Sequence, residues 1–509
     1  MDSKKAKIIS IVSIVALAAI LVGATYAYFQ AQTGEGSQTD IKINANTVDT
    51  FTFETGDPLS INLNQENFAS GKGNQTGSTY AKAILTANNK TNSATNKYYL
   101  YLNISNNTFG YTQDENTPEI ILTIKDGSNT ELTSVTGLTY KTVTDGKGNT
   151  ITGFDITNKD GLITIFNNRS ITTTSTTEET WNVTVTFVNY NLDQSANTGK
   201  SFNAKLMIQK EKMTLLANYV ISQYTGTQGE NGIYYHNTSL ENGAGDNSYR
   251  YAGADPNNFV CFGSDAATCP TDNLYRVIGV FENKVKLIKY DYANSNLLGI
   301  DGDYNTETFL KSNYSTYNGE LTTINKYFWN YKNDTSINDG KGSNTWSTSL
   351  LNKTNLNTNF INNIGEKWAN KIAIATWKVG GVESYLLSSR PSKAYQNEIV
   401  NSPNTTTEYS AKVGLMYVSD YGFSADPSAW TITMGSYDGS SNWMYMGLDE
   451  WTMTSNSSNQ YDVFGVHYYG YLDAAIANGV TSIRPSFYLK PSITYVSGSG
   501  TQSDPIRIN

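Results

Sequence analysis

The sequence predicts a mainly β protein with a mixed α+β second domain, preceded by one apolar amino-terminal segment. Three observations lead to this prediction: an uncharged run over residues 8–29, apolar residues that alternate with a period of two between residues 51 and 212, and mixed helical and strand patterns beyond residue 232. A chain of 509 residues is also too long for one ordinary core. We therefore expect two folded domains.

The composition favours a surface protein and argues against nucleic acid as a partner. Lys and Arg total 36 against 45 Asp and Glu, and no basic stripe follows Lys7. Tyr and Gly are abundant, with 36 and 41 copies, and Asn, Thr and Ser fill the stretches between apolar residues. This composition suits exposed β-structure and neutral ligands, although a biased base composition would produce the same excess of Asn and Tyr.

Residues 1–29 are predicted to be a signal peptide or an N-terminal transmembrane helix. The stretch IISIVSIVALAAILVGATYAYF, residues 8–29, is uncharged and long enough to cross a bilayer. Lysines precede it and the first acid after it is Glu35, so we expect the amino end in the cytoplasm and the remainder outside. The membrane is therefore a partner unless the segment is cut off during export.

A cleavage site is the alternative to a permanent anchor. The motif GATYAYF after the Lys-led apolar run resembles the export signal of the TasA/camelysin family, secreted Gram-positive biofilm-fibre proteins. The resemblance implies that a signal peptidase cuts between Ala27 and Tyr28. Residues 30–50 are then expected to form an extended arm, which would allow self-association by adding a strand to a neighbouring copy.

Residues 51–212 are predicted to form an antiparallel β-sandwich. In WNVTVTF, Trp181, Val183, Val185 and Phe187 share one face, and YLYLNI and IILTIKD alternate in the same way. Together with FTFETG, LSINLN, AKAILTA, GLITIF and SFNAKLMI they give about eight strands, separated by turns such as DGSN and DGKGN. The pattern fits an immunoglobulin-like or jelly-roll sandwich, and the family resemblance implies the same.

Residues 213–232 are predicted to be a short helix and a linker. MTLLANYVISQY changes to a helical period, and TGTQGENG then interrupts the chain with three glycines. We place the joint between the domains at this glycine run.

Residues 233–509 are predicted to form an aromatic-rich α+β head. All tryptophans except Trp181 lie beyond residue 320, STSLLNKTNLN and FINNIGEKWANKI have helical periods, and LYRVIGVFENKVKLIKYDY is typical of a hairpin. The region also resembles an uncharacterised module of exported proteins in gut Firmicutes and related bacteria, in the stretches DNLYRVIGVFENKVKLIKYDY, VGLMYVSDYGF, EWTMTS and the closing IRPSFYLKPSITYVSGSGTQSDPIRI. The RP-x-x-Y-L ending and the Trp-rich loops also resemble the formylglycine-generating-enzyme and C-type-lectin-like fold.

Cys261 and Cys269 are predicted to form a disulfide if the compartment is oxidising, with two free thiols as the alternative. Their spacing is not that of a zinc ribbon or a redox motif, and the chain has only two histidines. Closing so short a loop stabilises by about 2.5 kcal/mol. The bridge would therefore hold one local loop.

The aromatic residues Trp430, Trp443, Tyr445 and Trp451 are the best candidates for a ligand-binding surface. They lie among Gly, Ser and Asn, and such mixtures present flat apolar faces beside neutral hydrogen-bonding groups. A glycan or a protein would fit this chemistry. Burial of the same tryptophans as core residues is the alternative.

Acidic residues offer two weaker candidates. The stretch DGDYNTE resembles the opening of a calcium loop, but Thr306 and Ser312 stand where the loop needs Gly and Glu, so we predict no metal site. Its candidate ligands are Asp301, Asp303, Asn305 and Glu307. The pair Asp449 and Glu450 lies near tryptophans, as a glycosidase requires, but adjacent acids in a strand point to opposite faces.

The two histidines, His236 and His467, are predicted to be hydrogen-bonded surface or rim residues. Neither belongs to a zinc-protease motif, so the metallopeptidase activity described for camelysin-like proteins is not expected here. An oxidase of the formylglycine-generating type needs late cysteines, and none follows Cys269.

The prediction for function is an exported bacterial cell-surface or matrix protein that acts as an adhesin or ligand-binding module on a β-sandwich stalk. A TasA-like fibre subunit and a secreted glycan hydrolase are the alternatives. We predict no catalytic constellation and no cofactor.

Overall fold

The computed structural model describes residues 49–68, 72–88, 93–310, 314, 316–320, 323–333, 335–379, 389–400 and 408–509. The chain divides into two compact units: the first ends at Met213 and the second comprises Thr214–Asn509. Strands account for 40% of the structure and helices for 16%, so the prediction of a mainly β protein is confirmed.

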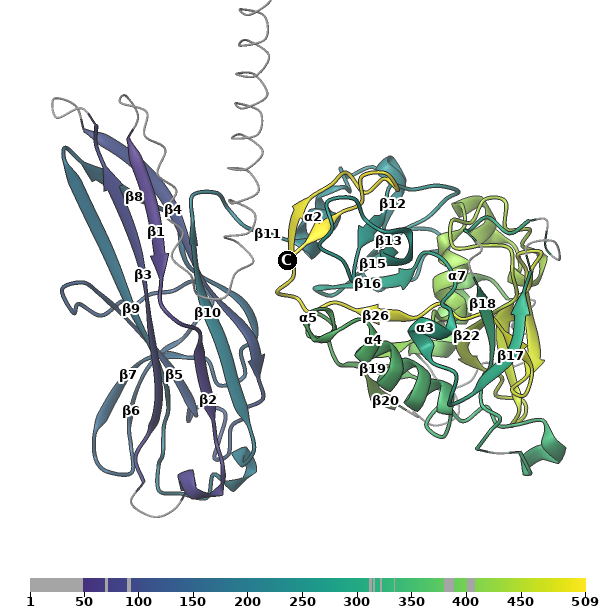
Figure 1. The fold of residues 1–509 in the computed structure, drawn as a ribbon, viewed down its shortest axis with the longest axis horizontal. Helices are drawn as coiled ribbons and strands as arrows, with labels where there is room; N and C mark the ends of the chain where they lie inside the picture. Colours follow the sequence, from purple (N-terminus) through teal and green to yellow (C-terminus); the bar gives the residue numbers. More distant parts are fainter. Residues whose placement is uncertain are drawn as a thin grey trace, which may run out of the picture. The chain divides into compact units, whose positions relative to one another are not determined.

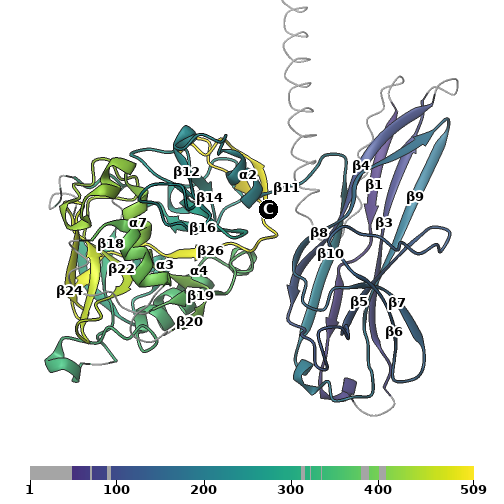
Figure 2. The same ribbon diagram turned by 180° about the vertical axis from the view of Figure 1, so that it is seen from behind.

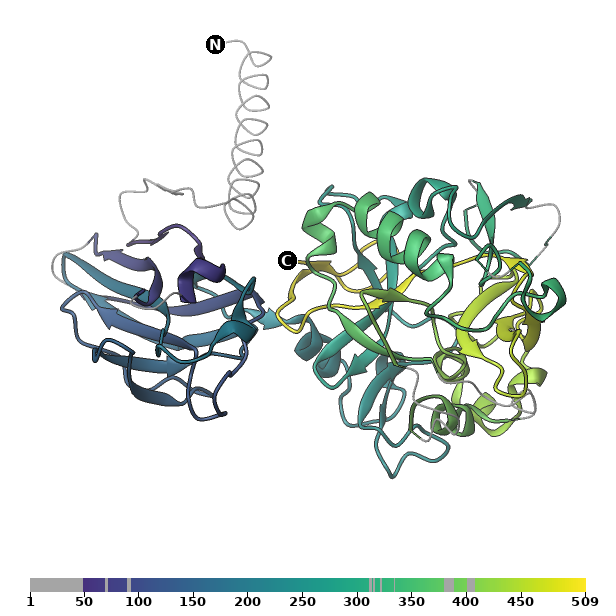
Figure 3. The same cartoon turned by 90° about the horizontal axis from the view of Figure 1, so that it is seen from below.

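The first unit consists of two antiparallel sheets that stack face to face around one core (Figures 1 and 3). One sheet has six strands, in the order β1 (Thr50–Thr55), β3 (Gln75–Thr86), β9 (Thr176–Phe187), β5 (Ile120–Asp126), β7 (Thr150–Asp155) and β6 (Tyr140–Thr144). The other has four, in the order β2 (Leu59–Asn62), β10 (Ser201–Gln209), β4 (Ala94–Asn107) and β8 (Gly161–Thr173). Two short 3-10 turns complete the unit, η1 (Gln65–Phe68) and η2 (Ser195–Asn197).

The predicted alternation determines which side chains reach this core. In β9, Trp181, Val183, Val185 and Phe187 are all buried, whereas Asn182 is exposed. The indole N–H of Trp181 donates to the Tyr98 hydroxyl at 2.8 Å, so its polar edge is satisfied inside the core. The period of two therefore gave the correct inner face.

The hairpin of β6 and β7 was missing from the predicted strands. Its turn, residues 145–149, was recognised, and the Asp145 carboxylate accepts hydrogen bonds from the backbone N–H groups of Lys147 and Asn149. β6 has no buried residue, because it is the outermost strand of its sheet. An edge strand lacks the strong apolar alternation on which the prediction depended.

The second unit combines several small antiparallel sheets with short helices (Figures 1 and 2). The largest sheet contains β12 (Ile233–His236), β13 (Ser248–Tyr251), β15 (Leu274–Phe281), β16 (Lys284–Lys289), β26 (Ser486–Tyr488) and β21 (Val413–Gly414), with β14 (Phe259–Cys261) paired to β15. One smaller sheet contains β11 (Thr214–Leu215), β27 (Thr494–Ser497) and β28 (Arg507–Ile508), and another contains β17 (Tyr304–Phe309), β18 (Ile324–Phe328) and β25 (Val480–Thr481). A third pairs β19 (Ala375–Lys378) with β20 (Glu408–Ala411), and a fourth contains β22 (Glu450–Ser455), β23 (Asp462–Val466) and β24 (Leu472–Ile476).

The helices of this unit are short, and α7 contacts β22 near the centre of the unit (Figure 2). They are α2 (Leu216–Ser222), α3 (Ser295–Leu298), α4 (Ile361–Asn363), α5 (Glu366–Ala369), α6 (Pro391–Tyr395) and α7 (Val418–Ser424), with the π-helices η7 (Leu351–Phe360) and η9 (Gln396–Val400). Single 3-10 turns are η3 (Glu230–Gly232), η4 (Thr271–Asn273), η6 (Ile337–Gly340), η10 (Pro427–Thr431) and η11 (Met434–Ser436). The two predicted helical segments correspond to η7, α4 and α5, of which Phe360 and Trp368 are buried.

The predicted linker of residues 213–232 belongs to the second unit. β11 pairs with β27, and Leu216, Ala217 and Val220 of α2 enter the main core of the unit. The glycine run forms a turn inside the unit, in which Gly226, Gly229 and Gly232 adopt positive φ. The joint therefore lies about ten residues earlier than predicted, because the apolar face of α2 must be buried and the second core buries it.

No helix among the described residues is long and apolar enough to cross a bilayer. The predicted leader or anchor, its cleavage site at Ala27 and Tyr28, and the arm up to residue 48 lie outside the described residues.

Candidate functional site

The three tryptophans predicted to form a binding surface are buried. Trp430, Trp443 and Trp451 expose 1%, 3% and 1% of their surface. Each indole N–H donates to a backbone carbonyl, at distances of 2.9 to 3.0 Å. An exposed tryptophan platform is therefore not formed, because these large rings fill the spaces beneath the loops and gain more from burial than from exposure.

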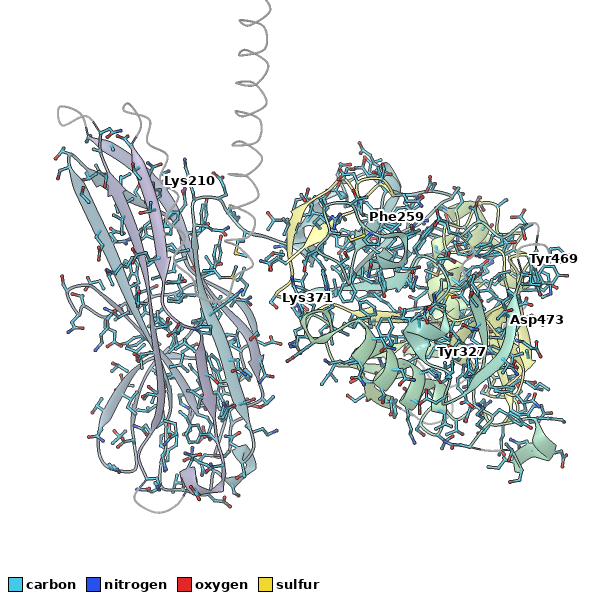
Figure 4. The ribbon with its side chains drawn as sticks, viewed as in Figure 1. Lys210, Phe259, Tyr327, Lys371, Tyr469 and Asp473 are labelled. Atoms are coloured by element: carbon cyan, nitrogen blue, oxygen red, sulfur yellow. A yellow bond between two sulfur atoms is a disulfide. The ribbon has the colours of Figure 1, made fainter. Side chains whose placement is uncertain are left out.

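A cavity of about 830 Å³ nevertheless lies beside two of the predicted residues, Trp443 and Tyr445. Loops 254–259, 316–320 and 438–446, which are far apart in the sequence, surround it. Phe259 and Tyr469, both labelled in Figure 4, line it from β14 and from loop 467–471. The volume is in the range of small-ligand sites, so this cavity is the candidate functional site.

A buried arginine forms the floor of the cavity. Arg276 of β15 donates from Nε to the Asn258 side-chain oxygen at 2.6 Å and from Nη2 to the Pro256 carbonyl at 2.8 Å. Its guanidinium carbon lies 4.3 Å from the ring centre of Phe259 and 4.7 Å from that of Trp443. Burial lowers the pKa of Arg276 to about 9, which leaves the group charged at neutral pH.

The wall and rim of the cavity add aromatic rings. Tyr290 packs edge-on against Phe259 with ring centres 5.0 Å apart, and the Tyr445 hydroxyl donates to the Tyr468 carbonyl at 2.6 Å. Tyr469 is 56% exposed and stands at the rim. A ligand in the cavity would therefore meet an exposed aromatic ring at the rim.

Loop 467–471 is stiffened by stacked rings. The imidazole of His467 stacks on Tyr471 at 4.4 Å and lies 4.2 Å from the ring of Tyr468. Tyr468 in turn lies 4.2 Å from Tyr469. His467 is partly buried, as the prediction of a rim residue requires, and its role here is to support the aromatic loop.

His236 is buried, contrary to the prediction of a surface or rim residue. Its Nδ1 accepts a hydrogen bond from the backbone N–H of Ala244 at 3.1 Å, and the ring packs against Phe423 and Trp430. Burial, with the nearby positive charge of Arg250, holds the pKa of His236 well below its usual value. A neutral imidazole among aromatic rings is a core residue.

The weak calcium candidates, Asp301, Asp303, Asn305 and Glu307, each bond to a different part of the fold rather than to a common centre. Asp303 is buried and accepts hydrogen bonds from the backbone N–H groups of Lys332, Leu350 and Leu351, at 2.9 to 3.1 Å. Its partners in the motif are used elsewhere: Asp301 accepts from Asn359, Asn305 accepts from the N–H of Glu307, and Glu307 pairs with Lys326. Within the described residues, no group of three or more His, Cys, Asp or Glu side chains is arranged to hold a metal ion.

The acidic pair also separates, as expected for adjacent residues at the start of a strand. Glu450 is buried and forms two hydrogen bonds of 2.8 Å with the guanidinium of Arg484. Asp449 accepts from the backbone N–H of Tyr468 at 2.9 Å. The two carboxylates therefore cannot flank one glycosidic bond.

A second set of buried charges lies around the start of α7. Lys286 of β16 and Asp420 of α7 form an ion pair at 2.5 Å, and Arg250 approaches the same carboxylate at 3.8 Å. Glu398 accepts from the N–H groups of Val418 and Ser419, both at 3.1 Å. This cluster joins β13, β16, η9 and α7 inside the unit, and none of its members lines the cavity.

Cys261 and Cys269, the predicted pair, are joined by a disulfide. Cys261 ends β14, two residues after the cavity residue Phe259, so the bridge fixes the loop that follows this strand.

Of the lining residues, sequence reasoning singled out only Trp443 and Tyr445; among those that it missed are Phe259, Arg276 and Tyr469. Arg276 interrupts the apolar run LYRVIGVF, and a charged residue in a buried strand was the available signal. Tyr469 lies in HYYGY, a cluster of aromatic residues that also could have been singled out. No family model, curated protein or solved structure matches this chain.

Proposed function

We propose that the protein is an exported bacterial cell-surface or matrix protein whose second unit binds a saccharide in the cavity above Arg276. The observation that carries this proposal is the cavity itself: tyrosine rings stand beside neutral donors and acceptors such as Asn318 and Ser440. Saccharides offer C–H faces for the rings and hydroxyl groups for the amides and hydroxyls. The unit thus acts as an adhesin or ligand-binding module.

The export part of the proposal rests on the amino-terminal segment and the disulfide. Residues 1–29 have the charge distribution of a leader or an anchor with the remainder of the chain outside. The disulfide of Cys261 and Cys269 suits an oxidising compartment. The resemblances to TasA/camelysin proteins and to an exported Firmicutes module support the same location.

For the first unit we propose a jelly-roll rather than an immunoglobulin-like sandwich. From β1 to β5, and again from β7 to β10, successive strands alternate between the two sheets, so the first two strands lie in different sheets. An immunoglobulin-like sandwich instead keeps its first two strands, A and B, in one sheet. For the second unit, the C-type-lectin-like fold remains our proposal, supported by its short strands and long Trp-filled loops.

A fibre subunit is the second candidate function, and the edge of one sheet favours it. β1 pairs with Ala81–Thr86 of β3, and the Gly56 N–H donates to the Tyr80 carbonyl at 2.9 Å, so residues 75–79 of β3 have no ladder partner on that side among the described strands. An added strand could use this edge. Filaments that form with increasing concentration, and are lost on deletion of residues 28–44, would support this candidate.

The glycan-hydrolase alternative gains no such support. Its candidate acids have separate partners: Asp449 accepts from the Tyr468 N–H, and Glu450 is engaged by Arg484. We propose binding without turnover.

Binding of the full-length chain, kept in detergent micelles, to immobilised oligosaccharides tests the main proposal. We expect saturable binding, no cleavage products, and at least about fivefold weaker binding for Tyr469→Ala, because loss of a contacting ring commonly costs more than 1 kcal/mol. Tyr80→Ala, which removes an exposed ring of the first unit, is the matched control. Equal binding by wild type and Tyr469→Ala, or retention of no saccharide, would refute the proposal.

A further inference from the structure

The rim of the cavity carries charges of one sign. Asp255, Glu320 and Asp438 come from three separate loops, and all three are exposed at the cavity. Among the lining residues that the structure describes, Arg276 is the one cation, and it is 4% exposed. The face that a ligand meets is therefore negative.

Arg276 offsets only one acid of this rim. Its donors are directed to Asn258 and to the Pro256 and Trp443 carbonyls, and of the three acids it forms a salt bridge with Asp255 alone, at 3.6 Å. The salt bridges within the described part of the chain include neither Glu320 nor Asp438. At least two carboxylates are thus left for a ligand.

Asp438 is also held in position. Its Oδ1 accepts hydrogen bonds from the Ser440 hydroxyl at 2.7 Å and from the Ser440 backbone N–H at 2.9 Å. These bonds lower the pKa of Asp438, so it stays ionised well into the acidic range. A fixed, ionised carboxylate beside an open tyrosine ring suits a group that is cationic and lies next to a flat C–H surface.

We propose that the saccharide bound in this cavity carries free ammonium groups, as an amino sugar without its acetyl group does. This inference rests on the proposed saccharide-binding function and specifies its ligand class. An ammonium group on the sugar ring would pair with Asp438 or Glu320 while the ring packs on Tyr469. An acetylated sugar would leave these carboxylates without a partner, and a uronic acid would be repelled by them.

A basic peptide is the competing ligand, since it too would be attracted to the acids. The rim also offers the uncharged groups of Thr316, Asn318, Ser440 and Gln502. A sugar presents hydroxyl groups to these and a C–H face to Tyr469, whereas the lysine side chain that carries the charge has neither hydroxyl groups nor a flat face, although its backbone amides could also bond to the rim. The chemistry of the rim therefore favours the amino sugar.

The test compares three probes on the full-length chain in detergent micelles by calorimetry: a glucosamine tetramer with free amines, the same tetramer fully N-acetylated, and tetralysine. We expect the free-amine tetramer to bind about tenfold more tightly than the acetylated one, since two exposed ion pairs each contribute a few-fold. Raising the salt concentration should reduce this difference.

Two variants test whether the rim acids cause the tighter binding of the free-amine tetramer. Asp438→Asn and Glu320→Gln should each weaken binding of the free-amine tetramer about threefold, the effect of one exposed ion pair. Asp473→Asn is the matched control, because Asp473, labelled in Figure 4, is exposed on β24 and is not one of the residues that line the cavity.

Each remaining outcome is decisive. Equal or tighter binding of the acetylated tetramer would overturn the inference and leave saccharide binding standing. Tighter binding of tetralysine than of both saccharides would overturn it in favour of a basic peptide. Binding of neither saccharide would refute both the inference and the proposed function.

Discussion

Replacing Glu398 by Gln should remove one large source of pH dependence from the stability of the second unit. Glu398 is buried on η9, where it accepts hydrogen bonds from Val418, Ser419 and the Thr454 hydroxyl. Burial raises the pKa of its carboxyl from 4.5 to about 7, although the hydrogen bonds from Ser419 and Thr454 act in the opposite direction.

The magnitude follows from the two pKa values. About 7 minus 4.5 is about 2.5, and at 1.36 kcal/mol per pKa unit this corresponds to about 3 kcal/mol. The folded chain holds the proton of Glu398 more tightly than the unfolded chain does. The stabilisation is therefore complete below pH 4.5 and is lost as the pH rises through about 7.

Urea unfolding followed by tryptophan fluorescence measures this effect, because all tryptophans except Trp181 lie in the second unit. Glu398→Gln cannot titrate at this position. The free energy of unfolding of the wild type minus that of the variant should therefore fall by about 3 kcal/mol between about pH 4 and about pH 8. Titrations common to both proteins cancel in this difference. A difference that stays flat, or that increases with pH, would refute the reasoning.

Three further predictions concern the stability and the division of the chain. Lys286→Met should lower the free energy of unfolding by about 3 to 5 kcal/mol, because it leaves the buried Asp420 without its close cation. The control Lys326→Met removes a more exposed ion pair and should lower it by under about 1 kcal/mol. Similar losses for both variants would contradict the assignment. Replacing both Cys261 and Cys269 by Ser should lower the free energy of unfolding by about 2.5 kcal/mol and speed amide hydrogen exchange only near the loop that the disulfide closes. Faster exchange throughout the second unit would show that the disulfide stabilises more than this loop. Proteinase K should cut first within residues 210–213, which are mostly exposed and lie at the boundary between the two units along the chain. A first cut within residues 225–232 would instead show that the linker is the glycine run.

Particular segments show how far the sequence could be interpreted. The alternation of Trp181, Val183, Val185 and Phe187 reports strand geometry directly, since successive side chains point to opposite faces. The hairpin of β15 and β16 was predicted for the same reason, and Val280 pairs with Val285 across its turn. Local periodicity fails at β6, which has no buried residue, and at α2, whose apolar face does not say which core will bury it.

The sequence by itself determined the mainly β class, most strands of the first unit and the cysteine pair, because each depends on residues that are close along the chain. Only the tertiary structure decided that three tryptophans are core residues. It also decided that Arg276 lies beneath a cavity whose loops are far apart in the sequence of the second unit. Arg276 and Trp443 are 167 residues apart, yet their groups are in contact. Whether a ring is buried or lines a site depends on which distant loops pack against it, and this is settled by the packing of the complete unit rather than by any local pattern.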